Sequence, residues 1–253
     1  MRPILLTIGS LQIPSWHVFY AIGAIVAFYA LIRSNRSLDA PIPERILSTL
    51  FVVTYISGFL GSRLLSIIIE QPEIDGLTHI VSAMFSFGPM TFFGGAISAF
   101  VVGIIFVFLR KLSLLRILDL SIPSGFIGLF FGRIGCFLNG CCYGVPIRQN
   151  FRLGIQQSIL EITRVPVQLI ESIFAGLFGV VLIIALSSKR WKAGDIGFLG
   201  IFGYSAFRFV IEFYRDDYRG WVLQNLLSTS QFISLVAAVI VTIAWPLIRF
   251  KKS

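Results

Sequence analysis

Long apolar stretches constrain what this chain can fold into more than any other feature of its sequence. A helix needs about 20 mainly apolar residues to cross a bilayer core of about 30 Å. Seven such stretches are present, at residues 15–32, 47–69, 91–109, 118–138, 166–187, 194–214 and 229–248. They predict an all-α polytopic membrane protein, in which seven transmembrane helices form one bundle and residues 1–253 form a single domain.

The composition supports this class and excludes others. Of the 253 residues, 56% are hydrophobic and only 13% are charged, whereas a soluble domain is about 45–50% apolar and about 25% charged. A chain this apolar would collapse rather than stay disordered. Three cysteines are too few for a disulfide framework. No small-residue cleavage site follows a short apolar core at the N-terminus, so we expect the first span to be retained.

The distribution of basic residues predicts the orientation. Twelve of the 21 lie on one side, at Arg33, Arg36, Arg45, Arg110, Lys111, Arg116, Lys189, Arg190, Lys192, Arg249, Lys251 and Lys252. Six lie on the other, at Arg2, Arg148, Arg152, Arg164, Arg215 and Arg219. The positive-inside rule then predicts an outer N-terminus and a cytoplasmic C-terminus. Because the basic residues flank spans and do not share one soluble face, we expect no nucleic-acid partner.

Three arginines remain, and all of them lie inside predicted spans: Arg63, Arg133 and Arg208. An arginine near the bilayer centre costs at least about 2.5–3.5 kcal/mol. One interpretation is that bundle carboxylates neutralise them and fix the packing. The other is a cavity for a phosphate or carboxylate, which a guanidinium binds bidentately.

The carboxylates help to choose between these interpretations. We expect Asp119 and Asp195 near the starts of their helices, so that only Glu171 and Glu212 lie deep in the spans. Three arginines against two glutamates leave an unpaired positive charge, which favours an anionic ligand.

One helix face carries much of this polarity. Tyr204, Arg208 and Glu212 are spaced i, i+4 and i+8, and Arg215 follows Arg208 by seven residues. Residues at such spacings share a face. In an apolar segment this polar stripe must face the bundle interior or a water-filled cavity.

Five motifs, in order along the chain, resemble those of the bacterial prolipoprotein diacylglyceryl transferase family. They are Gly61-Ser62-Arg63, Phe92-Phe93-Gly94-Gly95, the segment 132–144 (GRIGCFLNGCCYG), the segment 165–171 (VPVQLIE) and the segment 204–215 (YSAFRFVIEFYR). The resemblance runs from about residue 15 to residue 220.

The resemblance implies an enzyme of the bacterial cytoplasmic (inner) membrane that spans it several times. The family transfers a diacylglyceryl group from phosphatidylglycerol to the lipobox cysteine thiol of a lipoprotein precursor and releases glycerol phosphate. Phosphatidylglycerol, the precursor's signal peptide and the bilayer are therefore the expected partners. No metal or organic cofactor is expected.

The resemblance also implies roles for individual residues. Arg133 and Arg208 would be the principal phosphate ligands, with Arg63 in support. Glu212 would orient Arg208, and Tyr204 would supply a hydrogen bond. The expected catalytic set is Arg133, Arg208, Tyr204 and Glu212. The further expected substrate-binding residues are Arg63, Gly144, Gln168, Glu171 and Arg215, with Gly144 allowing a close backbone approach near the headgroup.

Several positions depart from the family pattern. The histidine before Gly-Gly, a candidate proton acceptor, is Phe93 here, and the signature asparagine and glutamate are Cys136 and Cys141. The first-span tyrosine falls on Trp16, next to His17, which could replace the missing base or only pack. A paralogue with another thiol or hydroxyl acceptor is therefore an alternative. A non-enzymatic protein that binds or transports anionic lipid is another.

The cysteines Cys136, Cys141 and Cys142 all lie within the signature, at the outer end of the fourth span. They could pack without further role, form a disulfide in an oxidising exterior, or include a reactive thiol whose pKa Arg133 lowers. The Cys-x4-Cys-Cys spacing is only a weak indication of a metal site, because no fourth ligand is evident.

Overall fold

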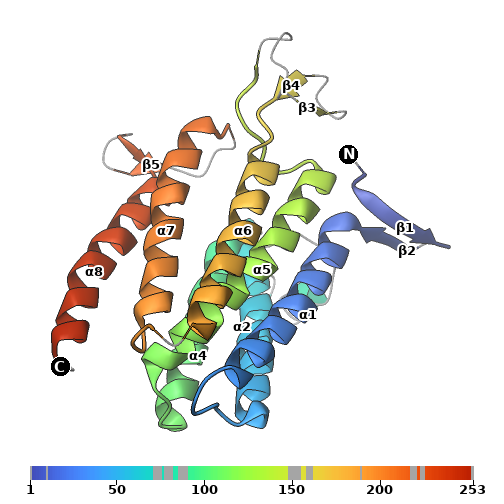
Figure 1. Ribbon diagram of the computed structural model, residues 1–253. Helices are drawn as coiled ribbons and strands as arrows, with labels where there is room; N and C mark the ends of the chain where they lie inside the picture. The colour runs from blue at the N-terminus through green and yellow to red at the C-terminus, as the bar shows by residue number, and fades with distance from the viewer. Residues whose placement is uncertain are drawn as a thin grey trace. The chain divides into compact units, whose positions relative to one another are not determined.

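The computed structural model describes residues 2–9, 11–70, 76, 82–84, 91–147, 155–157, 162–188, 190–216, 221–222 and 226–251. This part of the chain is mostly helical (Figure 1). The helices are α1 (Ser15–Arg36), α2 (Glu44–Glu70), α4 (Phe92–Leu109), α5 (Leu114–Asn139), α6 (Val167–Ser187), α7 (Asp195–Ile211) and α8 (Thr229–Lys251).

The helices confirm a helical protein that crosses the membrane several times. Six of them, all but α4, are long and apolar enough to span a bilayer, and α4 is a shorter apolar helix. Each predicted span coincides with one helix. The seventh span, the orientation and the single-domain organisation stay predictions.

The mostly helical structure is consistent with the predicted all-α class, and the described residues add three short antiparallel hairpins. β1 (Ile4–Ile8) pairs with β2 (Leu11–Pro14), β3 (Ile155–Gln157) with β4 (Ile162–Arg164), and β5 (Trp221–Val222) with β6 (Leu227–Ser228). In the first hairpin Ile8 is opposite Leu11, and Gly9 adopts a φ of +60° in the tight connection. Strands of two to five residues are too short for their alternation to be recognised against neighbouring apolar spans.

The chain divides into two compact units, residues 40–114 and residues 1–39 with 115–253. In the smaller unit, α2 and α4 pack through small residues. A Cβ on Gly94 would clash with the Gly61 backbone, and one on Gly95 would lie 2.9 Å from the carbonyl oxygen of Gly58. Thr91 also donates to the carbonyl of Ser62 at 3.0 Å. Glycine at these positions lets the two helix backbones approach closely.

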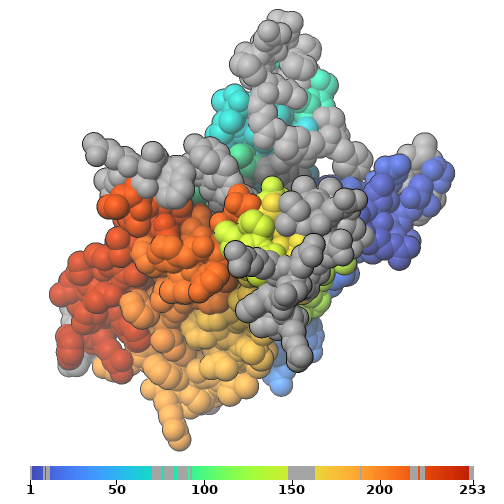
Figure 2. Space-filling view, turned by 90° about the horizontal axis from the view of Figure 1, so that it is seen from above, coloured from blue at the N-terminus to red at the C-terminus, as the bar shows by residue number. Residues whose placement is uncertain are grey.

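The larger unit holds α1, α5, α6, α7 and α8, which run alternately up and down (Figure 1). The three hairpins and the end of α5 lie at one end, and the C-terminus lies at the other. Seen from the hairpin end in Figure 2, the yellow-green chain around the end of α5 reaches the surface between the orange α7 and the blue N-terminal hairpin. This end carries the candidate site.

The basic anchors at the opposite end of this unit follow the predicted pattern. Arg33 and Arg36 are in the last turn of α1, Arg116 is in the first turn of α5, and Arg249 is near the end of α8. The anchors Arg148, Arg152, Lys189, Arg219 and Lys252 lie outside the described residues.

The position expected for Asp119 is wrong. Helix α5 begins at Leu114, so Asp119 lies inside the helix and is buried. Its carboxylate accepts hydrogen bonds from the backbone N–H groups of Gly194 at 2.6 Å and Gly197 at 2.8 Å. It therefore caps the N-terminus of α7, where free N–H groups and the helix dipole favour a negative charge.

Candidate functional site

A buried carboxylate joins three elements of the larger unit. Glu171, in the second turn of α6, is 0% exposed, and its Oε1 lies 2.8 Å from Nη2 of Arg133 on α5. The hydroxyl of Tyr204 on α7 donates to the same oxygen at 2.9 Å. Glu171 thus fixes both side chains. The proton of the Tyr204 hydroxyl is engaged by Glu171, so this tyrosine does not donate elsewhere in this arrangement.

A second carboxylate lies just beyond α7, in the 3-10 turn η1 (Glu212–Tyr214). Oε2 of Glu212 lies 2.7 Å from Nη2 of Arg208, so the expected i, i+4 pair is present. The hydroxyl of Ser228 donates to Oε1 of Glu212 at 2.9 Å. Arg208 Nη2 also donates to the hydroxyl of Ser230 at 3.1 Å. Glu212 is therefore held in place by the last residue of β6, and Arg208 by the first turn of α8.

Arg215 connects the two carboxylates. Its Nη1 lies 3.6 Å from Oε2 of Glu171, and its Nε lies 3.7 Å from Oε2 of Glu212. Its side chain is only 2% exposed. We call these five residues the arginine cluster: Arg133, Glu171, Arg208, Glu212 and Arg215. Three cations against two carboxylates give the cluster one net positive charge.

The arginine cluster also has spare hydrogen-bond donors. Among the described residues, buried Nε of Arg133 and Nη1 of Arg208 have no hydrogen-bond partner. An unsatisfied buried donor costs about 1–3 kcal/mol, and more on a charged group. An anion with several acceptor oxygens would satisfy both the donors and the net charge, so the cluster suits a phosphate or carboxylate ligand.

Arg63 belongs to the smaller unit and is described by itself. It is 3% exposed, and its Nε and Nη2 donate to the carbonyl oxygen of Ala83 at 3.0 and 2.7 Å. Its supporting role at the phosphate stays a prediction.

Gly144 lies where three backbone segments meet. A Cβ there would lie 2.5 Å from the carbonyl oxygen of Val165 and 2.8 Å from that of Tyr214. Nη1 of Arg164 donates to the Gly144 carbonyl at 3.0 Å and to Oδ2 of Asp216 at 2.6 Å. The close approach of the Val165 and Tyr214 carbonyls is thus sufficient to require glycine at position 144. The expected approach of the Gly144 backbone to a lipid headgroup stays a prediction.

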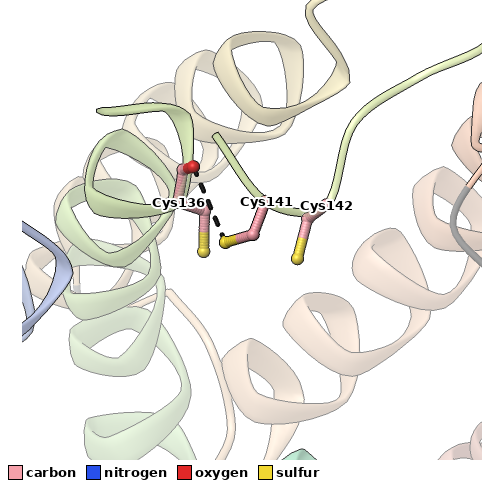
Figure 3. Close-up of side chains that lie close together, drawn as sticks. All are labelled: Cys136, Cys141 and Cys142. Atoms are coloured by element: carbon pink, nitrogen blue, oxygen red, sulfur yellow. Dashed lines mark hydrogen bonds between the residues drawn. The ribbon is translucent and has the colours of Figure 1, made fainter. Parts of the chain in front are cut away.

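The three thiols come together at the end of α5, with Cys136 in its last turn and Cys141 and Cys142 just after it (Figure 3). Their Sγ atoms all lie within 4.8 Å of one another, and the Cys141 thiol donates to the carbonyl of Cys136 at 3.7 Å. Nε2 of the fully buried Gln168 donates to the Cys141 carbonyl at 2.8 Å. The hydrogen bond with Cys136 lowers the pKa of the Cys141 thiol, but hydrogen bonding to Cys142 and burial together raise it above its usual value. No disulfide bond joins any two of these three cysteines.

Sequence reasoning missed Ser228 of β6, Ser230 of α8 and the Arg164–Asp216 pair. Ser228 and Ser230 carry no motif of their own, and their spacing of two residues at a helix start indicates only a cap. The sequence groups Arg164 with the outer basic residues, whereas in the structure it is 9% exposed and lies over the Tyr143 ring at 4.4 Å.

Comparison with known proteins agrees with this geometry. The family model described as prolipoprotein diacylglyceryl transferase matches residues 3–247. The chain belongs to the prolipoprotein diacylglyceryl transferase family. That assignment confirms the resemblance found in the motifs and identifies the chain as a transferase, which argues against the non-enzymatic alternative.

Three relatives illustrate how much of this transferase family's length the chain covers. A phosphatidylglycerol–prolipoprotein diacylglyceryl transferase of Clostridium tetani is 33% identical over 100% of both chains. A second, from Clostridium perfringens and numbered 2, is 34% identical over 93% of this chain and 91% of its own. A third, from Bordetella parapertussis, is 32% identical over 92% of this chain and 90% of its own.

Proposed function

We propose that this chain transfers a diacylglyceryl group from phosphatidylglycerol to the lipobox cysteine of a lipoprotein precursor and releases glycerol phosphate. The proposal places it in the bacterial inner membrane, with the N-terminus outside and seven spans. The hairpin end of the larger unit, where the arginine cluster lies, would then face the outer leaflet. Family membership and the names of the relatives support the reaction.

The observation that carries the proposal is the net positive charge of the arginine cluster. Burying a charge is costly unless it is paired, and within the arginine cluster three guanidinium groups face two carboxylates. The phosphodiester of phosphatidylglycerol carries one negative charge and accepts several hydrogen bonds. It would balance the cluster and engage the spare donors of Arg133 and Arg208.

The same groups would act on the transition state. As the thiolate attacks the terminal glycerol carbon, the bond from that carbon to the phosphate oxygen breaks and its electron pair stays on the phosphate. Charge therefore grows opposite Arg133 and Arg208, and donors already in position stabilise it without reorganisation. Glu171, Glu212 and Tyr204 would act as positioning residues, because their contacts are with the arginines and with each other.

The lipid donor is tested with purified protein in detergent. Phosphatidylglycerol labelled in its free glycerol should release labelled glycerol phosphate only when a lipobox peptide is added, and the peptide should gain the mass of a diacylglyceryl group. Glycerol phosphate release with an unmodified peptide would favour the paralogue with another acceptor. If a bacterium depleted of its own transferase contains the inserted protein but recovers neither growth nor lipidated precursor, the assigned acceptor is wrong.

A further inference from the structure

The thiol cluster begins one helical turn beyond Arg133, which the proposed function assigns to the phosphate. Cys136 follows Arg133 by three residues on α5, and Gln168 precedes Glu171 by three residues on α6. Glu171 bonds to Arg133 and Gln168 bonds to the Cys141 carbonyl, each at 2.8 Å. Helix α6 is thus bonded to α5 at Glu171 and to the turn that follows α5 at Gln168. Three residues of α-helix separate Gln168 from Glu171 by about 4.5 Å along the axis of α6.

The spacing of the sulfur atoms suits a metal ion. A zinc–sulfur bond is about 2.3 Å long, which places sulfur ligands about 3.8–4.0 Å apart around one ion. The three Sγ atoms already lie within 4.8 Å of one another, and Figure 3 shows them on the same side of the chain. Cys142 reaches this position with a left-handed φ of +60°, which is uncommon for a residue other than glycine.

The ligand set leaves one coordination position open. Thiolates favour soft ions such as Zn²⁺. Among the described residues, the group that could hold an ion consists of Cys136, Cys141 and Cys142 alone. Zinc sites with three protein ligands keep their fourth position for water or substrate.

We propose that Cys136, Cys141 and Cys142 bind one Zn²⁺ whose fourth position takes the acceptor thiol as a thiolate. This inference rests on the proposed function, which supplies a cysteine as the acceptor. Coordination to zinc deprotonates a thiol outright, and this chain has Phe93 at the position of the family's candidate proton acceptor. Coordination to zinc would therefore generate the acceptor thiolate next to Arg133 without that base.

The chemical step balances without an oxidant or reductant. The acceptor thiol loses its proton to water when its sulfur binds zinc. The sulfur then forms a bond to the terminal carbon of the diacylglyceryl group while the carbon–oxygen bond to phosphate breaks. The electron pair of that bond remains on glycerol phosphate, which Arg133 and Arg208 hold. A separation of one helical turn is of the same order as the near-attack distance of about 3–3.5 Å plus the intervening carbon–oxygen bond.

Metal binding is measured first, independently of activity. Protein purified under anaerobic, reducing conditions is loaded with Co²⁺, which gives a charge-transfer absorption for each bound thiolate. We expect one Co²⁺ to bind per chain and Zn²⁺ to displace it. The charge-transfer absorption should have the intensity of three bound thiolates. Because the chain has only three cysteines, the triple variant Cys136→Ser, Cys141→Ser, Cys142→Ser is the matched blank. Absence of this absorption in the folded protein would overturn the metal site.

The acceptor is tested on the Co²⁺-loaded protein. A lipobox peptide should raise the sulfur charge-transfer intensity in proportion to a fourth thiolate, whereas the same peptide with serine in place of cysteine should leave it unchanged. Identical spectra with both peptides would overturn the role of the open position. Alkylation mass spectrometry of protein prepared without reductant provides a further check, since thiols protected until a disulfide is reduced would contradict zinc ligation.

Activity then separates this inference from the proposed function. Removing the metal with a chelator should lower diacylglyceryl transfer at least about tenfold, and Zn²⁺ should restore it. Full transfer by metal-free protein would overturn the inference and leave the proposed function intact. Conversely, three-thiolate Co²⁺ binding that responds to the cysteine peptide, in a protein that never releases glycerol phosphate, would contradict the proposed function alone.

Discussion

Oε1 of Glu171 lies 2.8 Å from Nη2 of Arg133, and the carboxylate is fully buried between α5, α6 and α7. Replacing one partner of a buried ion pair is strongly destabilising, by about 3–5 kcal/mol, because the remaining charge is uncompensated. Glu171→Gln keeps the shape but removes the charge, and we expect a lower melting temperature together with a large loss of transfer. Glu44→Gln, at an exposed position in the first turn of α2, is the control. Equal melting temperatures for the two variants would contradict a structural role of the pair.

Arg133 is the residue on which the phosphate assignment depends most. Arg133→Ala should lower kcat by at least about 100-fold, the cost of removing one preorganised donor from a transition state. Arg133→Lys keeps the charge but loses the planar fork, so we expect an intermediate rate. Steady-state release of glycerol phosphate measures both, with Arg116→Ala at the exposed start of the same helix as the control. An Arg133→Ala variant with the wild-type rate would refute the assignment.

Ser228 offers a milder test of the positioning of Glu212. Its hydroxyl donates to Oε1 of Glu212 at 2.9 Å, and a net hydrogen bond is worth about 1 kcal/mol, or roughly fivefold in rate. We expect Ser228→Ala to lower kcat/KM by about this factor while the protein stays folded. Ser187→Ala, at the exposed end of α6, should have no effect. An unchanged kcat/KM in Ser228→Ala would remove Ser228 from the site.

Gly144 and Gly125 form a matched pair for backbone crowding. A Cβ on Gly144 would lie 2.5 Å from the Val165 carbonyl oxygen, whereas one on Gly125 would meet nothing within 4 Å among the described residues. We expect Gly144→Ala to destabilise the protein by about 1–3 kcal/mol, as overpacking does. Gly125→Ala should be neutral or stabilising by up to about 1 kcal/mol. Thermal unfolding in detergent compares the stability of the two variants. A Gly144→Ala variant more stable than Gly125→Ala would contradict the backbone crowding at Gly144.

Asp119 should matter for stability rather than for chemistry. Its carboxylate accepts from two backbone N–H groups at the start of α7, and hydrogen bonds to a charged group are worth about 1.5–3 kcal/mol each. Asp119→Asn should therefore lower the melting temperature while kcat of the folded fraction stays near the wild-type value. The control is Asp39→Asn at an exposed position. A selective loss of kcat without loss of stability would contradict the capping role.

Much of this arrangement could be predicted because apolar length and helix periodicity are local properties. The spans and the Arg208–Glu212 pair follow directly from residue spacing. The bridge from Glu171 to Arg133 joins residues 38 positions apart, and it depends on which faces of α5 and α6 meet. The capping of α7 by Asp119, across 75 residues, was missed for the same reason. The three-thiol cluster needed the turn after α5, including the left-handed φ of Cys142, which no residue pattern indicates.

The pairing of Arg133 with Glu171 has a consequence for how the protein is made. Arg133 emerges from the ribosome on α5 well before its counter-ion, which follows 38 residues later on α6. An unpaired arginine entering lipid costs at least about 2.5–3.5 kcal/mol, and the bond to Glu171 offsets that cost only when both helices are present. If α5 is retained until α6 has been made, the two helices can enter the bilayer together as one hairpin, and the cost of an unpaired Arg133 in lipid is avoided.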